Sequence, residues 1–478
     1  GVRWGFVNRE DYEPVLAAHG WRPMETLANG VRVWQNPDAE LPSGGGSRAV
    51  DGSAAAAAWG ALPLLSLAVA GGVASAGLWR GWRRRFGRMR TRIAEILRGV
   101  HHLAVGLLPL SLCFWFYRVV LRGRHADVYL IYDAVLFYVS DAVALTAVAS
   151  WAGRRLLLPS HGASRPSSPL RWVLLLVVAL AASSAAWSTA PTVSFYSALH
   201  LGAVLGLFLS LEDEPDSWRF VAIGSLFALA VQAVVAVTQF LRQSTAFLAP
   251  LGLPWPGSVI PSASGASVVE LADGTRWLRA YGTLPHPNVL GGWLIALAAA
   301  PVALFMEKGW RRWWTVPLFG SSVAALMLSF SRSAWLGAAA AGAVMLYHWG
   351  RLNHRRLLIL GAVAVGALMV TVIPLRSLFY TRVADLSVST EARSLRERAT
   401  LRQKATGFIK RRPLLGTGVG AFVPTLMERS LDGAPAEPAH SVPQLATAEL
   451  GVVGGGLALV AAALIVNQAR SARNESGV

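Results

Sequence analysis

Long apolar runs, separated by short polar or basic stretches, make up most of the chain. They lie near residues 58–79, 101–121, 128–150, 172–187, 193–211, 219–241, 287–306, 314–330, 333–349, 357–375 and 446–467. Each approaches the ~20 residues that an α-helix needs to cross a bilayer. The pattern therefore predicts an all-α polytopic membrane protein with about eleven transmembrane helices. Residues 58–478 form its membrane domain.

Residues 1–57 precede the first apolar run and have a mixed, soluble character. Within them the pattern indicates a helix near residues 11–20 and a strand near residues 31–34, followed by a linker rich in Pro, Gly and Ser. About forty residues rarely fold alone. We therefore interpret residues 1–57 as an extracytoplasmic segment and linker, the tail of a larger domain.

The composition agrees with a membrane protein and excludes other classes. The 478 residues are 54% hydrophobic and have a mean hydropathy of +0.45, which is too apolar for a soluble protein. The formal net charge is +18, but the basic residues gather in stretches between the apolar runs, so no separate nucleic-acid-binding domain is expected. The single cysteine, Cys113, excludes an intrachain disulfide and predicts a small packing residue.

Arginine-rich stretches predict the orientation of the helices. With eleven helices these stretches fall on one side, which the positive-inside rule makes cytoplasmic: residues 80–98, 153–171, 308–312 and 351–356. The segments that then lie outside are residues 1–57, 242–286 and 376–445. The longest, 376–445, is a large extracytoplasmic loop between the last two helices.

Acidic residues near the third apolar run have two interpretations. Asp127, Asp133 and Asp141 lie in or beside that run, and acids inside a membrane often mark a proton path. The alternative is that they cap a helix or pair with neighbouring arginines. We favour capping or pairing.

The first polar segment expected outside is Arg279-Ala-Tyr-Gly-Thr-Leu-Pro-His-Pro-Asn288. An arginine near the end of a helix is explained by its reaching toward the interface. That explanation does not account for the density of turn and polar residues in this segment. Arg279, His286 and Asn288 are therefore candidate site residues.

The second segment is Ser329-Phe-Ser-Arg-Ser333, a short outer turn between two apolar runs. An arginine there opposes the positive-inside bias. Binding an anionic ligand would account for Arg332.

The third segment is the large loop. It contains a predicted helix that ends before Pro413, with Arg398 and Arg402 on one face because they are four residues apart. That basic face binds either substrate or lipid headgroups. An apolar stripe on the same helix is expected to rest on the bundle or the membrane surface: Leu401, Ala405, Phe408 and Ile409.

A glycine-rich stretch, Gly416 to Gly420, follows that helix and predicts a tight turn. It lacks the lysine and the preceding strand of a phosphate-binding loop. His440 comes next, nine residues before Glu449 at the start of the last apolar run.

Together these segments place arginines and one histidine at a single outer cavity. Guanidinium groups suit bidentate recognition of phosphate and can neutralise the charge of a leaving diphosphate. A neutral histidine can take a proton from an attacking hydroxyl. No paired acids accompany them, so neither a catalytic metal nor another cofactor is expected.

The order and spacing of these motifs resemble the O-antigen ligase and polymerase superfamily of bacterial envelope proteins. The matching elements are Arg279–Asn288, Ser331–Ser333, Ser394–Arg398, Pro413–Gly420, His440 and Glu449–Gly451. The resemblance covers Thr192 to Leu464 and excludes residues 1–57.

The resemblance implies a glycosyltransferase of the bacterial cytoplasmic membrane with an extracytoplasmic active site. It would move a glycan from undecaprenyl diphosphate to a hydroxyl of lipid A–core, a growing glycan or a protein. Arg279, Arg332 and Arg398 would bind substrate together with His286, Asn288 and Glu449, and His440 would be catalytic. The alternative is a transporter of a small anion such as bicarbonate, which should carry its charged groups near the bilayer midplane.

Overall fold

The computed structural model describes residues 4–7, 17, 20–26, 32–35, 87–123, 131–158, 168–252, 258–263, 265–308, 312–349, 353–383, 389–429 and 437–475. The chain divides into two compact units, Gly1–Gly81 and Trp82–Val478. The predicted helix near residues 58–79 lies outside the described residues.

The described part of the first unit is a small antiparallel sheet. Its strands are β1 (Trp4–Val7), β2 (Arg22–Thr26) and β3 (Arg32–Gln35), in the order β1-β3-β2. Trp34 is buried. The predicted strand near residues 31–34 is confirmed by β3, whereas most of the predicted helix at residues 11–20 lies outside the described residues.

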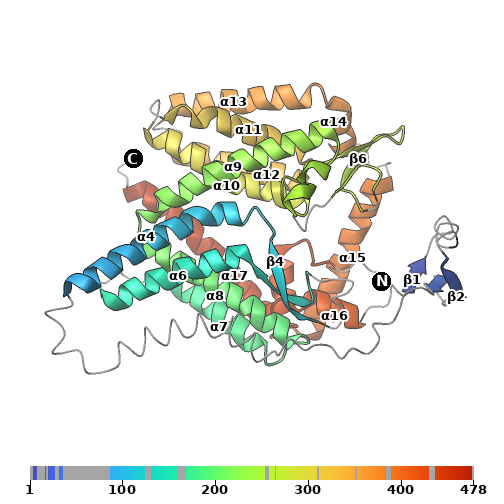
Figure 1. Ribbon diagram of the computed structural model, residues 1–478, viewed down its shortest axis with the longest axis horizontal. Helices are drawn as coiled ribbons and strands as arrows, with labels where there is room; N and C mark the ends of the chain where they lie inside the picture. Colours follow the sequence, from blue (N-terminus) through green and yellow to red (C-terminus); the bar gives the residue numbers. More distant parts are fainter. Residues whose placement is uncertain are drawn as a thin grey trace. The chain divides into compact units, whose positions relative to one another are not determined.

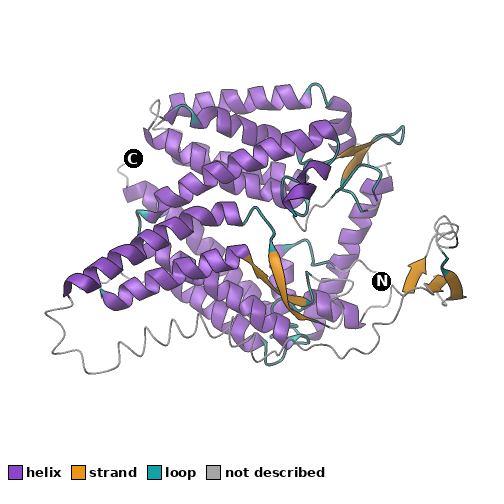
Figure 2. Ribbon diagram, in the orientation of Figure 1, coloured by secondary structure: helices purple, strands orange, loops and turns teal. Residues whose placement is uncertain are grey.

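The second unit is mostly helical, as Figure 2 shows. Its α-helices are α4 (Gly87–Ser111), α6 (Val139–Leu157), α7 (Pro169–Ser184), α8 (Pro191–Asp213), α9 (Ser217–Arg242), α10 (Pro287–Lys308), α11 (Thr315–Leu328), α12 (Arg332–Trp349), α13 (His354–Val372), α14 (Arg376–Val383), α15 (Ser389–Arg411), α16 (Phe422–Arg429) and α17 (Val442–Glu475). Several begin where the sequence predicts: Pro169, Pro191 and Pro287 each occupy a first helical position, where proline's missing N–H costs nothing.

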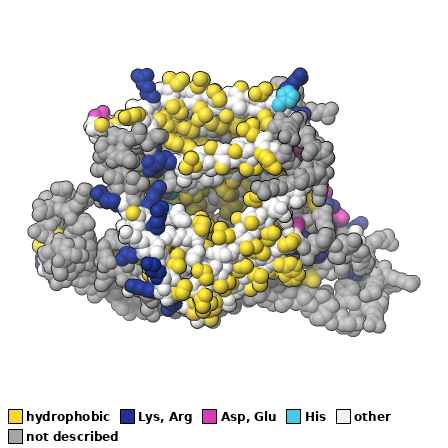
Figure 3. Space-filling view, turned by 180° about the vertical axis from the view of Figure 1, so that it is seen from behind, with side chains coloured by type: hydrophobic (Ala, Val, Ile, Leu, Met, Phe, Trp, Pro, Cys, Tyr) yellow, Lys and Arg dark blue, Asp and Glu magenta, His cyan; other side chains and the backbone are white. Residues whose placement is uncertain are grey.

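Six of the described helices are long and apolar enough to cross a membrane: α4, α8, α9, α10, α13 and α17. Helices α7 and α11 are apolar but shorter. These helices support a multi-pass membrane protein, while the expected total of eleven stays a prediction. Large apolar side chains face outward, with Leu241 76% and Val370 77% exposed, and Figure 3 shows hydrophobic side chains across the middle of the visible face with Lys and Arg toward its edges.

The helices of the second unit form two groups, one in the upper part of Figure 1 and one in the lower part. In one group α9, α10, α11, α12 and α13 pack together, and in the other α4 and α6 pack beside α7, α8 and α17. Helix α4 also packs on α9 and joins the groups. The largest core cluster lies in the first group and includes Leu229, Leu294 and Phe330. Cys113 is fully buried in this cluster, so its predicted packing role is confirmed.

Two short hairpins interrupt the helical pattern. Strands β4 (Tyr117–Arg122) and β5 (Ala134–Tyr138) pair antiparallel, as do β6 (Val268–Glu270) and β7 (Arg276–Leu278). A short 3-10 helix, η3 (Ala246–Leu251), precedes the second hairpin.

The predicted helices at 101–121 and 128–150 are therefore wrong at the C-terminal end of the first and the N-terminal end of the second, where the structure has strands β4 and β5. Helix α4 begins at Gly87 and ends at Ser111, and α6 begins only at Val139. All eight arginines between Arg80 and Arg98 are expected in a loop from the sequence, yet the last four, from Arg88 onward, lie on α4.

Residues 376–445 are not an extended loop in their described part. They contain α14, α15 and α16, and α15 ends at Arg411, just before Pro413 as predicted. The position of this segment outside a membrane stays a prediction.

Asp141 caps α6. One of its carboxylate oxygens accepts the backbone N–H of Tyr138 over 2.9 Å, and the other lies 3.0 Å from His200 Nε2. The capping interpretation is confirmed for Asp141, with a histidine as its partner in place of the expected arginine. Asp127 lies outside the described residues.

Candidate functional site

The polar segments predicted from the sequence meet at one end of the helices. Helices α9, α11 and α13 end there, and α10 and α12 begin there, because neighbouring helices run in alternate directions. Figure 1 shows β6, α14 and α15 at this same end, on the right of the view. Helix α14 packs against β6, so segments far apart in the sequence adjoin.

Two glutamines of α9 hold the first polar segment in place. Gln239 accepts the N–H groups of Tyr281 and Gly282 over 3.0 and 2.9 Å, and its amide donates to Gly282 O over 2.6 Å. Gln232 accepts the N–H of Thr283 over 3.1 Å and donates to its hydroxyl over 2.6 Å. Both glutamines are fully buried, so these bonds satisfy polar groups that would otherwise be costly to bury.

Gly282 is required by this attachment. Its φ of +63° lies in the left-handed region, and a Cβ there would come within 2.0 Å of Gln232 Oε1. Glycine alone adopts this conformation without strain or clash. The segment is therefore rigid up to the start of α10.

Arg279 joins the first segment to the second. It is 5% exposed, and its Nε donates to Ser329 O over 2.8 Å while Nη2 donates to Asn288 Oδ1 over 2.7 Å. The neighbouring backbone N–H of Ala280 donates to Leu328 O over 3.0 Å. The guanidinium group is thus held in one orientation by two parts of the chain.

The second segment contains a strained turn. Phe330 has a φ of +47°, which a bulky side chain rarely adopts. Its ring is fully buried and lies 4.7 Å from the ring of Phe379 of α14. Packing of this ring against α14 stabilises the turn, and Arg332 follows as the first residue of α12.

Arg382 of α14 is an additional arginine at this turn. It is 6% exposed, its Nε donates to Phe330 O over 2.9 Å, and its own carbonyl accepts from Nη1 of Arg332 over 3.1 Å. Sequence reasoning missed Arg382 because it is one of many arginines in 376–445. The apolar residues Leu378 and Phe379 on the same helix, both buried, could have indicated that this helix packs on the protein and that Arg382 is buried with it.

His286 is a neutral, hydrogen-bonded side chain. The N–H of Asn288 donates to its Nδ1 over 3.1 Å, so the proton lies on Nε2, which is 3.0 Å from Ser267 Oγ. Burial and, after it, the positive charge of Arg279 are the main causes that lower the pKa of His286 from its ordinary 6.5 to about 4. Glu437 opposes these effects, and His440 and Arg382 add to them. These charges therefore surround His286.

His440 pairs with Glu437 at the more open edge of the site. Its Nε2 lies 3.5 Å from Glu437 Oε2, and the two side chains are 46% and 55% exposed. The interaction with His440 lowers the pKa of the Glu437 carboxyl, as do the nearby charges of His286 and Arg398. The predicted residues Arg279, His286, Arg398 and His440 thus fall within one electrostatic neighbourhood.

The helix that carries Arg398 packs as predicted. Leu401, Ala405 and Phe408 of α15 are buried against Phe422, Val423 and Leu426 of the following segment. Ile409 packs partly against the same cluster. The apolar stripe therefore rests on the protein, while Arg402 on the other side is exposed.

The glycine-rich stretch is a tight turn, as predicted. Gly416, Gly418 and Gly420 have φ values of +66°, +102° and +71°. The N–H of Gly418 donates to Glu449 O over 2.8 Å, and that of Val452 donates to Pro413 O over 2.8 Å. The turn is thus bonded to α17.

Glu449 stabilises the same turn with its side chain. Its carboxylate accepts the N–H of Gly420 over 2.9 Å and that of Phe422 over 3.2 Å. This contact gives Glu449 a structural role, and its predicted contact with substrate stays a prediction.

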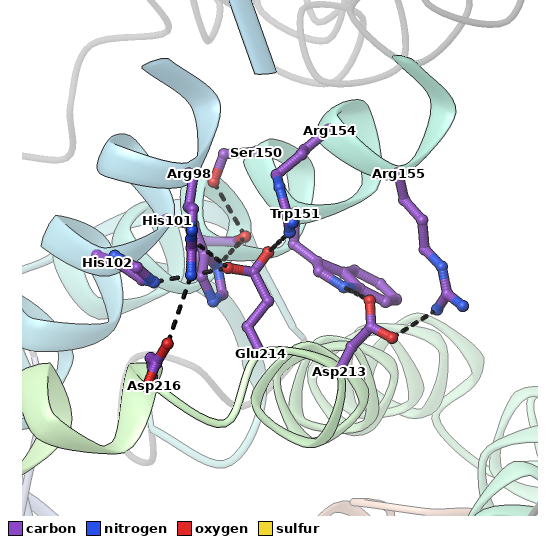
Figure 4. A network of polar contacts seen from close by, with 11 residues as sticks. Arg98, His101, His102, Ser150, Trp151, Arg154, Arg155, Asp213, Glu214 and Asp216 are labelled. Atoms are coloured by element: carbon purple, nitrogen blue, oxygen red, sulfur yellow. Dashed lines mark hydrogen bonds and ion pairs between the residues drawn. The ribbon is translucent and has the colours of Figure 1, made fainter. Parts of the chain in front are cut away.

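A second polar cluster lies at the opposite end of the helices. Figure 4 shows Arg98 and His102 of α4 turned toward Glu214, with Arg154 of α6 on its other side. Glu214 is 5% exposed, forms ion pairs with Arg154 and, at 3.7 Å, with Arg98, and lies 3.5 Å from His102 Nε2. Because basic and acidic groups pair here, this cluster has the character of a structural junction.

Metal binding has no support from the described side chains. Among the residues that the structure describes, no group of three or more His, Cys, Asp or Glu is arranged to hold an ion. The expected independence from metals stays a prediction.

Comparison with protein-family models gives a match in the second half of the chain. Residues 317–459 match the model described as O-antigen ligase. The predicted resemblance is confirmed over residues 317–459, which are similar to an O-antigen ligase domain. The match includes Arg332, Arg398 and His440 but not Arg279 or His286. A search of curated proteins and a search of solved structures each returned no match.

Proposed function

From the O-antigen ligase domain and the site beside it, we propose that the protein transfers a glycan from undecaprenyl diphosphate to an acceptor hydroxyl. The reaction takes place at the extracytoplasmic face of the bacterial cytoplasmic membrane. The acceptor is a lipid A–core sugar, a growing glycan or a protein. The family match gives no support to the anion-transporter alternative.

One observation supports this proposal most strongly. Arg279, Arg332 and His286 are brought together at one end of apolar helices, beside the pair of Glu437 and His440. Fixed guanidinium groups at a membrane surface suit a diphosphate on a lipid, because planar N–H donors match phosphate oxygens. The more exposed His440 faces the side from which a soluble or glycan acceptor arrives.

The charges at the site suggest how the reaction proceeds. The acceptor O–H breaks as its proton passes to His440, and the freed electron pair bonds to the anomeric carbon of the donor. The bond from that carbon to the diphosphate oxygen breaks, and undecaprenyl diphosphate leaves with the electron pair. Arg279 and Arg332 stabilise the negative charge that develops on the diphosphate. Arg398, which is half-buried on α15, helps to bind the donor.

Three further residues support the transfer without reacting themselves: His286, Asn288 and Glu449. Asn288 accepts a hydrogen bond from Arg279 and so fixes the guanidinium. His286 stays neutral at physiological pH because of its lowered pKa, and therefore adds no charge beside the diphosphate. Glu449 holds the glycine turn next to the site.

The test is a transfer assay with purified protein in the presence of EDTA. The substrate is an undecaprenyl-diphosphate glycan, with the acceptor either supplied or omitted. The proposal predicts a glycosylated acceptor and release of undecaprenyl diphosphate only when the acceptor is present. Absence of transfer, together with bicarbonate flux in proteoliposomes, would overturn it.

A further inference from the structure

Glu437 and His440 sit on a short segment that is fixed between two contacts. Ala439 lies between them, is 5% exposed and packs in the cluster that contains Leu401 and Phe408 of α15. Directly after the pair, the N–H of Leu445 donates to Ser441 O over 2.8 Å at the start of α17. The buried alanine and the helix start hold the segment in place.

The carboxylate of Glu437 lies among cationic and titratable groups. Those that influence it are His440, His286 and Arg398. Burial raises the pKa of Tyr132, in the loop between β4 and β5, and the negative charge of Glu437 raises it further. Glu437 therefore lies within electrostatic reach of the first polar segment, of α15 and of Tyr132.

The geometry fixes which nitrogen of His440 is available. Nε2 faces Glu437 Oε2 at 3.5 Å. A carboxylate is an acceptor, so this nitrogen carries the proton of the neutral ring and Nδ1 keeps a lone pair. The distance exceeds an ideal hydrogen bond, but such contacts often shorten only when substrate binds.

We propose that Glu437 is the positioning residue of His440: its carboxylate holds Nε2–H, so that Nδ1 takes the proton of the acceptor hydroxyl. The inference rests on the proposed transfer. During the step the O–H bond breaks, the proton bonds to Nδ1, and the ring becomes an imidazolium beside the carboxylate. Glu437 stays ionised throughout and stabilises that cation. Nδ1 returns the proton to solvent once the product leaves.

A plain surface ion pair would have different consequences. Exposed pairs contribute little to stability, typically below about 1 kcal/mol, so removing one would change neither folding nor activity. A positioning carboxylate leaves stability nearly unchanged and alters the rate, because it fixes the tautomer and stabilises the charged ring.

The test compares Glu437→Gln with the matched control Glu428→Gln, an exposed glutamate of α16, in the transfer assay from pH 5 to 9. We expect Glu437→Gln to lower kcat about 10- to 100-fold with little change in KM for the donor. Thermal unfolding and the Glu428 variant should match the wild type.

A second comparison shows whether Glu437 acts through His440. In a His440→Ala background the Glu437→Gln change should have no further effect on kcat, because the residue it positions is gone. Equal rates and pH profiles for wild type and Glu437→Gln would overturn the inference while leaving the transferase proposal intact. No transfer by the wild type would overturn both.

Discussion

The hydrogen bonds of Arg279 explain why a lysine should not replace it. Nε and Nη2 reach acceptors on different segments, Ser329 O and Asn288 Oδ1. A lysine keeps the charge but lacks the planar, forked donors.

We predict that Arg279→Lys lowers the transfer rate about 100-fold and that Arg279→Ala lowers it at least as much. The control is Arg122→Ala, an exposed arginine of β4, which should transfer at the wild-type rate. Rates are measured with the undecaprenyl-diphosphate glycan at saturating acceptor. Wild-type activity in Arg279→Lys would show that charge alone suffices.

His286 gives the folded protein a specific dependence on pH. Its folded pKa of about 4 lies below the ordinary 6.5, so between these values the unfolded chain binds a proton that the folded chain does not. The stability associated with neutral His286 is therefore present above pH 6.5 and is lost as the pH falls through 4.

We predict that His286→Gln, which cannot titrate, unfolds with a weaker pH dependence than the wild type between pH 7 and 4. The two unfolding temperatures should differ most at pH 7 and converge in acid, with a free-energy change on the order of a few kcal/mol at most. Thermal unfolding in detergent measures this. A difference independent of pH would contradict the assignment of a buried neutral ring.

At the residue scale the sequence predicts the site arginines but not what holds them. Arg332 is conspicuous because it opposes the expected charge bias, and Arg279 because turn and polar residues are dense around it. Gln232 and Gln239 are equally unusual in an apolar helix and share a face, being seven residues apart. Their partners include backbone groups 51 and 43 residues away, and no side-chain pattern identifies a backbone partner.

At the scale of elements, α17 and the turn that precedes α16 form one unit. Gly451 has a φ of +68° inside α17, and this break lets the N–H of Val452 reach Pro413 O. A Cβ at Gly451 would lie 2.0 Å from Leu414 O.

We predict that Gly451→Ala destabilises the protein by about 2 kcal/mol or more, because it combines backbone strain with a clash against a carbonyl. Gly456→Ala in the same helix is the matched control. A Cβ at Gly456 meets no atom within 4 Å, so alanine there should be neutral or stabilising by up to about 1 kcal/mol. Unfolding temperatures that fall equally in both variants would contradict the proposed break.

The elements between 101 and 150 show a limit of apolar patterning. Val119, Val120 and Leu121 continue the apolar run of α4, yet they form β4. An apolar run alone does not separate a helix from a strand. The β-branched residues Val119 and Val120 were the feature that favoured a strand. Helix α15 was predicted from its apolar stripe, but α14 and α16 were not. Their apolar residues, such as Leu378 and Leu426, are buried against other elements of the fold.

At the scale of the whole molecule, the two ends of the helices differ in chemistry. The site end gathers Arg279, Arg332 and Arg382. At the opposite end Asp213, Glu214 and Asp216 form ion pairs with arginines of α4 and α6. The cluster around Glu214 is therefore internally paired. The apolar periodicity predicted the membrane class, but the pairing at the opposite end could not be foreseen without the helix packing.

We predict that Glu214→Gln lowers the unfolding temperature by an amount equivalent to about 2 kcal/mol, because Arg98 and Arg154 lose a buried counter-charge. Their partial exposure, 39% and 31%, keeps the cost below that of a fully buried pair. Asp216→Asn, with a side chain that is 65% exposed, should stay within about 0.5 kcal/mol of the wild type. Equal losses in both variants would contradict a buried junction at Glu214.

The most direct test of the central claim measures release of undecaprenyl diphosphate by purified protein in EDTA, with acceptor present, for the wild type and Arg332→Ala. The site assigned to Arg332 predicts steady release by the wild type and at least about a 100-fold slower release by the variant, with both proteins unfolding at similar temperatures. Equal release by the two would show that the diphosphate is bound elsewhere. No release by the wild type would contradict lipid-linked glycan transfer itself.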